Sequence, residues 1–304
     1  MAIRAVKKQK TTRQDPRLET GIAAFANEFA DRKSAVSGML VKSSQASLAN
    51  SLKLLAKATF IRASWGTKSC DAGQAFLHLE AEIGQSIFLA KYGIRTLSNS
   101  TGAKLPQEAN MVADLSNLSF AKLPAVVLSN LKSESSVLLV HIDSDGLVFQ
   151  CQNANGKTEM FFQVAAVHID DQAQVVLDPG LVGNLPLESM ADVLVPSAKL
   201  QKTLESTSRV SFVFTPSGSL RIEDDRDIAV IKHFFQASTD CKRSASYIRK
   251  SVQAALKEMR VFVEATAGSQ TRLLRVSATC VGISLVANWD SGSAYFASPQ
   301  QEDV

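Results

Sequence analysis

The stretch VLLVHIDSDGLVFQCQNANGKTEMFFQV, residues 137–164, contains three apolar runs of strand length, separated by two turn sequences. Residues 143–146 end in Asp-Gly and residues 153–156 end in Asn-Gly. Both dipeptides tolerate the positive φ angles that tight hairpins require. A candidate helix at 119–135 directly precedes the stretch. Residues 119–164 are therefore predicted to form a short helix followed by three antiparallel strands.

The same order of a short helix and then strands recurs along the chain. The expected helices lie at 47–60, 119–135, 193–206 and 244–259. Strands with a hairpin turn at Gly84-Gln85 follow the first helix, and a turn at 216–218 follows the third. The sequence thus predicts an α+β fold, in which repeated helix-plus-antiparallel-strand units form two similar domains.

The chain divides by composition into an arm, two bodies and a connector. Residues 1–17 contain six basic side chains and one acidic side chain, whereas the rest contains 27 basic and 28 acidic ones. We expect a basic N-terminal arm with a possible amphipathic helix (21–41) within 1–43, a first domain at 44–169 and a second at 191–304. Residues 170–190, rich in Pro, Gly and Leu, are the expected connector. The 21–41 segment fits a helix lying on the body and a targeting or partner-binding segment equally well.

No motif of the chain indicates catalysis or metal binding. Gly156-Lys157-Thr158 lacks the earlier glycine of a phosphate loop, because position 151 is a cysteine, and a strand follows it instead of a helix. Asp143, Asp145 and Gly146 lack the remaining ligands of a calcium loop. The four cysteines are too widely spaced for a zinc site, and the four histidines are isolated, so we expect hydrogen-bonded histidines. We predict a non-enzymatic protein with no catalytic residue, no metal and no cofactor.

Basic side chains accompany each expected helix, on the side opposite its apolar residues. One interpretation is four ordinary amphipathic helices with solvated outer faces. The other is a continuous positive surface that binds duplex phosphates without reading bases. The candidate DNA-binding residues are Lys53, Lys57, Lys132, Lys199, Lys202, Arg249, Lys250 and Lys257.

Residues 109–164, 85–99 and 193–224 together resemble the DNA sliding clamps, which include proliferating cell nuclear antigen and the phage clamps. The resemblance covers roughly residues 44–298. It implies that the helices line the hole of a ring, that the sheets form the outside, and that two domains per chain assemble as a homotrimer. It also implies a DNA polymerase and a clamp loader as partners.

In this family a partner peptide binds an apolar pocket near the connector. The residues expected to form it are Val176, Leu177, Leu181, Val182 and Leu185, for which packing of the connector on the sheets is an equally good interpretation. Two other functions stay open at the sequence level. One is a β-rich structural or assembly protein, such as a virion component with a basic arm, and the other is a monomeric processivity factor.

The sequence also carries expectations about location. No apolar run approaches the roughly 20 residues that a membrane span needs, so no membrane association is expected. The basic N-terminus is not followed by the apolar run of a signal peptide. We therefore expect a cytoplasmic protein, or one in the compartment that holds the replicating DNA.

Overall fold

The computed structural model describes residues 16–29, 36–67, 74–84, 86–97, 111–116, 118, 136–143, 145–170, 191–206, 211–214, 219–223, 229–234, 256–267, 273–278 and 282–299. Its helices are α1 (Pro16–Glu28), α2 (Lys42–Leu55), α5 (Ser197–Ser206) and α6 (Leu256–Ala267). Its strands are β1 (Val36–Leu40), β2 (Phe60–Thr67), β3 (Gln74–Ile83), β4 (Ser86–Thr96), β5 (Met111–Leu115), β6 (Val137–Asp143), β7 (Gly146–Gln152), β8 (Thr158–Asp170), β9 (Ala191–Pro196), β10 (Ser211–Phe214), β11 (Ser219–Glu223), β12 (Ala229–Phe234), β13 (Leu273–Ala278), β14 (Gly282–Trp289) and β15 (Gly292–Pro299).

The expected helix-and-strand units are recognisable among the described residues, and in the first and third units a strand precedes the helix. The first unit is β1-α2-β2-β3-β4, and the third is β9-α5-β10-β11-β12. The second unit contains β5 and β6-β7-β8, and the fourth contains α6 and β13-β14-β15. The helix expected at 119–135 lies outside the described residues, and Leu118 directly before it is described.

The hairpins that the glycines predicted are confirmed. Gly84, Gly146 and Gly156 all have positive φ, at 62°, 130° and 74°. Strands β6, β7 and β8 pair antiparallel in the order of the sequence. A Cβ atom on Gly146 would lie 2.0 Å from the carbonyl oxygen of Val164, so the turn excludes any larger residue.

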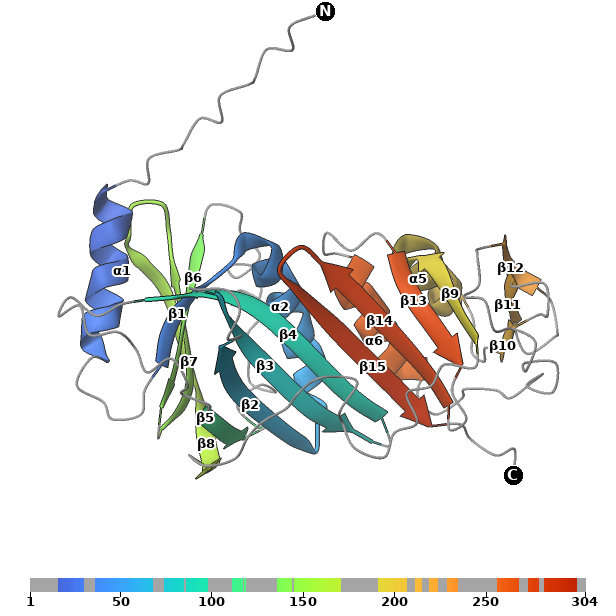
Figure 1. Cartoon of the computed structure of the whole chain (residues 1–304), viewed down its shortest axis with the longest axis horizontal. Helices are drawn as coiled ribbons and strands as arrows, with labels where there is room; N and C mark the ends of the chain where they lie inside the picture. The colour runs from blue at the N-terminus through green and yellow to red at the C-terminus, as the bar shows by residue number, and fades with distance from the viewer. Residues whose placement is uncertain are drawn as a thin grey trace, which may run out of the picture.

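One sheet of twelve strands runs through most of the molecule, in the order β1-β6-β7-β8-β5-β2-β3-β4-β15-β14-β13-β9. Strand β1 also pairs with β4, which closes the first eight strands on themselves. Strand β4 pairs with β15, and this pair joins the N-terminal units to the fourth unit. Strands β10, β11 and β12 form a separate three-stranded sheet at the far right of Figure 1.

Helices α2, α6 and α5 cover one face of this sheet (Figure 1). Leu48, Leu52 and Leu55, which recur at helical spacing on one side of α2, are completely buried. They join a main core that includes Phe262 of α6 and Leu200 of α5. The apolar sides of the helices and the apolar side chains of the strands therefore meet in one core. None of the described helices has the length and apolar character needed to cross a membrane.

The fourth helix differs from its prediction. The helix expected to end at 259 continues to Ala267 as α6 (Leu256–Ala267), whereas 244–255 lie outside the described residues. Met259, Phe262, Val263 and Thr266 are buried at helical spacing, whereas Glu264 is exposed. The β-branched Val261 and Val263 have a lower helix propensity, and the buried face at a 3.6-residue period outweighs that local preference.

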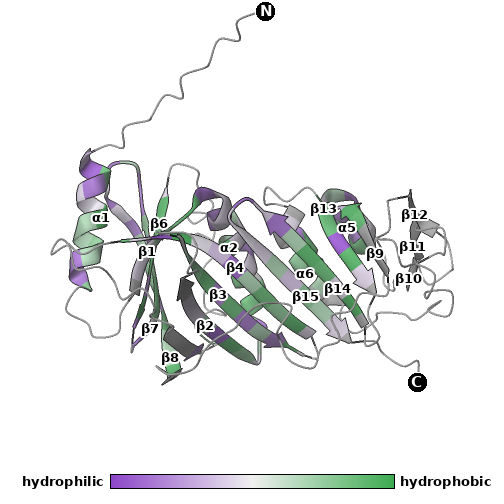
Figure 2. Cartoon of the chain, in the orientation of Figure 1, coloured by the Kyte–Doolittle hydropathy of each residue, from purple (hydrophilic) through white to green (hydrophobic). Residues whose placement is uncertain are grey.

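The N-terminal region also differs. Helix α1 begins at Pro16, earlier than the expected helix at 21–41, and Val36–Leu40 form strand β1. This strand pairs with β4 and β6, so residues assigned to the arm are part of the main sheet. Helix α1 carries both hydrophobic and hydrophilic residues (Figure 2) and buries Leu18, Phe25 and Ala26, as expected for an amphipathic helix.

Candidate nucleic-acid interface

The helix layer concentrates the positive charge of the body. Segments 42–57, 197–206 and 256–267 contain seven basic residues and three acidic residues. Residues 18–304 as a whole carry one more acidic side chain than basic side chains. Because α6 contacts both α2 and α5, the backbones of these helices lie in one layer on one side of the sheet.

Three predicted DNA-binding lysines lie exposed on this layer. Lys199 and Lys202 are on the exposed side of α5, whose Leu200 and Leu204 are buried, and Lys57 follows the C-terminal end of α2. The backbones of Lys53 and Lys257 lie in α2 and α6, but their side chains are outside the described part. Lys132, Arg249 and Lys250 lie outside the described residues altogether. The structure thus brings the two lysines of α5 together and leaves the continuity of the predicted surface untested.

Helix α2 is more deeply buried than an amphipathic surface helix. The polar residues Ser44, Gln45, Ser47, Asn50 and Ser51 are all at most 6% exposed, because α6 packs against α2 from the side. Small polar residues permit this close packing. Ser51 Oγ accepts a 2.6 Å hydrogen bond from the Tyr92 hydroxyl and donates to the Ser47 carbonyl oxygen at 2.9 Å. The expectation of a fully solvated outer face is therefore wrong for most of α2.

A group of serines fixes the fourth unit to the first. The Gly93 backbone N–H donates to Ser44 Oγ at 3.0 Å and to the Ser291 carbonyl oxygen at 2.7 Å. The Trp289 indole N–H also donates to Ser44 Oγ, at 3.0 Å, and Ser43 Oγ contacts Ser291 Oγ. These bonds join the β14–β15 turn to the start of α2. Sequence analysis missed the group, because single serines carry no spacing signal.

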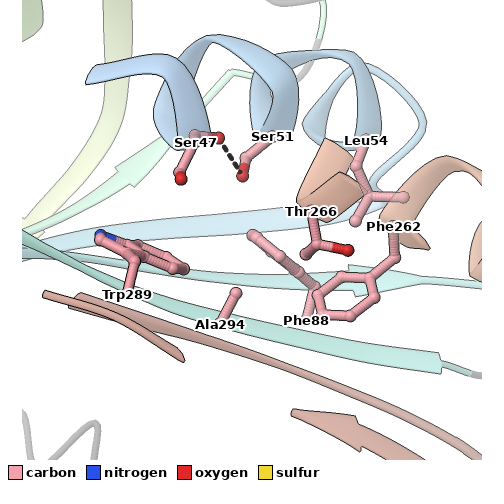
Figure 3. Close-up of a pocket in the computed structure, with 8 residues that line it drawn as sticks. All are labelled: Ser47, Ser51, Leu54, Phe88, Phe262, Thr266, Trp289 and Ala294. Carbon is pink, nitrogen blue, oxygen red and sulfur yellow. Dashed lines mark hydrogen bonds between the residues drawn. The ribbon is translucent and has the colours of Figure 1, made fainter. Parts of the chain in front are cut away.

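A small cavity lies between α2, α6 and the strands at this junction (Figure 3). Its lining includes Ser47, Phe88, Phe262 and Trp289, and its volume of about 10 Å³ is what a single water molecule occupies. Ser47 Oγ is buried there without a hydrogen-bond partner among the described residues. The cavity is too small for a substrate. Within the described ranges, no three His, Cys, Asp or Glu side chains lie close enough together to hold a metal ion.

One edge of β8, the last strand of the second unit, is suited to bind another strand. The corresponding edge of its counterpart within the chain is paired. That counterpart is β15, the last strand of the fourth unit, which pairs with β14 on one edge and with β4 on the other. Strand β8 pairs with β7 through residues 158–165 and with β5 through residues 166–170. Along 158–165, no described strand pairs with the edge opposite β7. Among the strands that the structure describes, β12 likewise pairs only with β11.

An aromatic side chain marks this edge. In β15, Phe296 faces the main core and Tyr295, paired with Leu89 of β4, is 6% exposed on the outer face. In β8, Phe162 packs against the main core, and Phe161 is 52% exposed. Phe161 therefore occupies the position of Tyr295 at an edge that no described strand covers.

An apolar patch crosses the junction on the face opposite the helices. It consists of Leu89 and Tyr295, with Ile87, Val286 and Ala297 packed against them. Burial raises the pKa of Tyr295 above its usual value, against the opposing effect of a hydrogen bond with Ser284. The alternating apolar residues of β4, β14 and β15 carried this signal, but sequence analysis did not use it. The predicted peptide-binding residues 176–185 lie outside the described residues.

Three solved structures are similar to this chain over nearly their whole length. Proliferating cell nuclear antigen (PCNA) from Thermococcus kodakaraensis has a TM-score of 0.56 at 11% identity, covering 88% of this chain and 100% of that one. A PCNA2–PCNA3 complex from Sulfolobus tokodaii gives 0.53 at 11% identity, with 88% and 99% coverage. PCNA from Entamoeba histolytica gives 0.52 at 12% identity, also with 88% and 99% coverage. No family model and no curated protein matches the sequence.

The chain therefore has the PCNA-like sliding-clamp fold, an α+β architecture of repeated helix-and-strand units.

Proposed function

We propose that this protein is a non-enzymatic DNA sliding clamp, which encircles duplex DNA and tethers a replicative polymerase. The edge of β8 that no described strand covers along 158–165 is the observation that carries the proposal, because its counterpart β15 uses the same edge to bind β4 within the chain. Since β12 is the counterpart of β4 in the third unit, β12 of one chain pairs with β8 of the next. In Figure 1 these two strands lie toward opposite ends of the long axis.

Head-to-tail pairing of two different edges generates a ring when the rotation between copies closes. Each copy contributes the domains 44–169, extended by β1, and 191–304, joined by the connector 170–190. We take three copies, as the resemblance to two-domain clamps implies. In this ring Phe161 becomes buried between chains, as Tyr295 is buried within one chain.

The helix layer faces the DNA in this arrangement. Lys57, Lys199 and Lys202, together with Lys53, Lys132, Arg249, Lys250 and Lys257, contact phosphates of the duplex. Contacts of this kind are sequence-independent and weaken with salt, which permits sliding. The threaded topology, rather than the strength of these contacts, keeps the ring on DNA.

The polymerase and the clamp loader bind the outer side of the ring. The connector residues Val176, Leu177, Leu181, Val182 and Leu185 and the apolar patch around Tyr295 and Leu89 support one peptide-binding region there. The protein acts in the cytoplasm, or in the compartment that holds the replicating DNA.

Retention on closed circles tests the proposal. The protein is loaded with its clamp loader on a nicked plasmid, washed in high salt and treated with a restriction enzyme that linearises the plasmid. We expect protein to stay on circles through the wash and to leave once the DNA has ends. Release by salt from circles and linear DNA alike would show ordinary electrostatic binding and would contradict a ring.

A further inference from the structure

Helix α1 lies on the face of the sheet opposite the helix layer of α2, α5 and α6. Leu138 and Val140 of β6 belong to the main core, whereas Val137 and Leu139 pack with α1. Because side chains alternate between the faces of a strand, α1 and the helix layer are on opposite sides of β6. Strands β6 and β7 are consequently buried along their full length.

The surface under α1, which we call the α1 seat, consists of Met39, Val137, Leu139, His141 and Val148. Four side chains of the helix segment cover it: Leu18, Phe25 and Phe29 are at most 8% exposed, and Ile22 packs beside them. The contact forms a cluster separate from the main core. The sheet below is complete without α1, since β1, β6 and β7 pair along their lengths and pack on the other face.

At the centre of the seat is a buried polar chain that the sheet builds by itself. Ser37 Oγ lies 2.7 Å from His141 Nδ1, and His141 Nε2 lies 3.0 Å from Asp143 Oδ2. Asp143 Oδ1 also accepts the Asp145 backbone N–H at 2.7 Å. Both ring nitrogens are thereby held by β1 and β6, which fixes the plane of the imidazole without any contribution from α1.

The fixed imidazole presents its face to α1. The Phe29 ring stacks on His141 with centroids 3.9 Å apart, and the Phe25 ring meets it edge-on at 6.5 Å. Burying His141 and Asp143 under a helix costs solvation that an apolar pair would not. A buried polar group of this kind can serve specificity, here towards the two aromatic rings that contact the imidazole.

The seat also selects a glycine in the helix. A Cβ atom on Gly21 would lie 2.5 Å from the Gly156 carbonyl oxygen, in the β7–β8 turn. The Gln152 side-chain amide donates to the Gly21 carbonyl oxygen at 3.0 Å. The recognised pattern is therefore Leu18, Gly21, Ile22, Phe25 and Phe29, a helix with one apolar side and one point of close approach.

From these contacts we infer that the α1 seat is a helix-binding site, which α1 occupies in cis as an autoinhibitory segment. When α1 leaves, the site takes an amphipathic helix of a partner protein with the same glycine and aromatic spacing. A 13-residue helix is marginal by itself, so its release costs little internal helix energy. The inference rests on α1 and β6 alone and does not depend on ring closure or DNA binding.

A competition experiment on the full chain tests it. The probe is a fluorescent peptide of residues 14–31, and its anisotropy reports binding to wild type and to the Phe25→Ala/Phe29→Ala chain. We expect binding to the substituted chain to be at least about tenfold tighter, because α1 no longer fills the site. Equal binding to both chains, or no binding to the substituted one, would overturn the inference.

Peptide variants test the specificity. Peptides with Gly21→Ala or Phe29→Ala should each lose about tenfold in affinity, whereas Ala24→Gln, on the exposed side, should bind as the parent does. If the Gly21→Ala peptide matches the parent, the seat does not read the helix pattern, and the inference fails.

Hydrogen exchange of the wild-type chain decides the matter even if the substituted chain does not fold. Amides of α1 should exchange at least about a hundredfold faster than those of β6, through local opening. Exchange of both elements at one common rate would make α1 an integral part of the fold and would overturn the inference.

Discussion

At the residue scale, the proposed DNA contact of the α5 lysines is the one most open to a direct test. Lys199→Gln/Lys202→Gln should weaken binding to duplex DNA and lower the slope of log K against log salt by about 2, since each phosphate contact contributes about 0.9. Lys157→Gln, an exposed lysine in the β7–β8 turn, is the matched control. A slope unchanged in the double variant, or lowered equally by the control, would remove α5 from the DNA surface.

Glu80 gives the fold a pH dependence. Burial raises the pKa of this carboxyl group, with Arg62 lowering it and Asp114 raising it further. The folded state therefore holds the proton more tightly than the unfolded state, whose pKa is near 4.5. The stability present below that pKa is lost as pH rises through the folded-state pKa.

Urea midpoints between pH 4 and pH 7 measure this contribution. Wild type should lose stability with rising pH relative to Glu80→Gln, which has no proton to release. Parallel midpoints for the two chains across this range would mean that Glu80 does not titrate differently on folding.

At the element scale, the proposed assembly depends on the edge of β8. Phe161→Glu should prevent association of chains while changing the free energy of unfolding by less than about 1 kcal/mol, because the side chain is 52% exposed. Val167→Glu, on the β8 segment that pairs with β5, is the control and should assemble normally. Analytical ultracentrifugation distinguishes the two, and an assembled Phe161→Glu chain would place the contact elsewhere.

Helix α2 holds the core under the first unit. Leu52→Ala, at a completely buried position, should cost about 2–5 kcal/mol in the free energy of unfolding. Ala46→Gly, at a half-buried helix position, should cost only about 1 kcal/mol. Comparable losses in chemical denaturation would mean that Leu52 contributes helix propensity rather than packing.

The sequence predicted the elements whose signals are local. Gly84, Gly146 and Gly156 marked three turns, because each position needs a positive φ that glycine supplies. The seat of α1 was missed, although the run VLLVHI in β6 is apolar at consecutive positions, which indicates a strand buried on both faces. The pairing of β4 with β15 joins residues some 200 positions apart, and no local signal encodes such a partner.

At the scale of the whole molecule, the proposed ring has two kinds of junction, one within each chain and one between chains, and both pair the same kinds of strand. Within the chain, β4 and β15 join, with Leu89 and Tyr295 packed on the outer face. Between chains, β12 and β8 join, with Phe161 in the place of Tyr295. The same units thus serve an internal and an external contact. The set of lysines in the proposed DNA interface remains partly a prediction. The sequence assigns residues to helices, but it does not show how far a neighbouring helix buries each side chain.

Cross-linking between β8 and β12 tests ring closure most directly. One cysteine is placed on the free edge of β8 within 158–165, a second one in β12, and the oxidised protein is measured by non-reducing electrophoresis and mass photometry. Closure predicts covalent links between different chains and a single closed oligomer, for which we expect three copies. A protein that stays monomeric at micromolar concentration, with no link between chains, would contradict it.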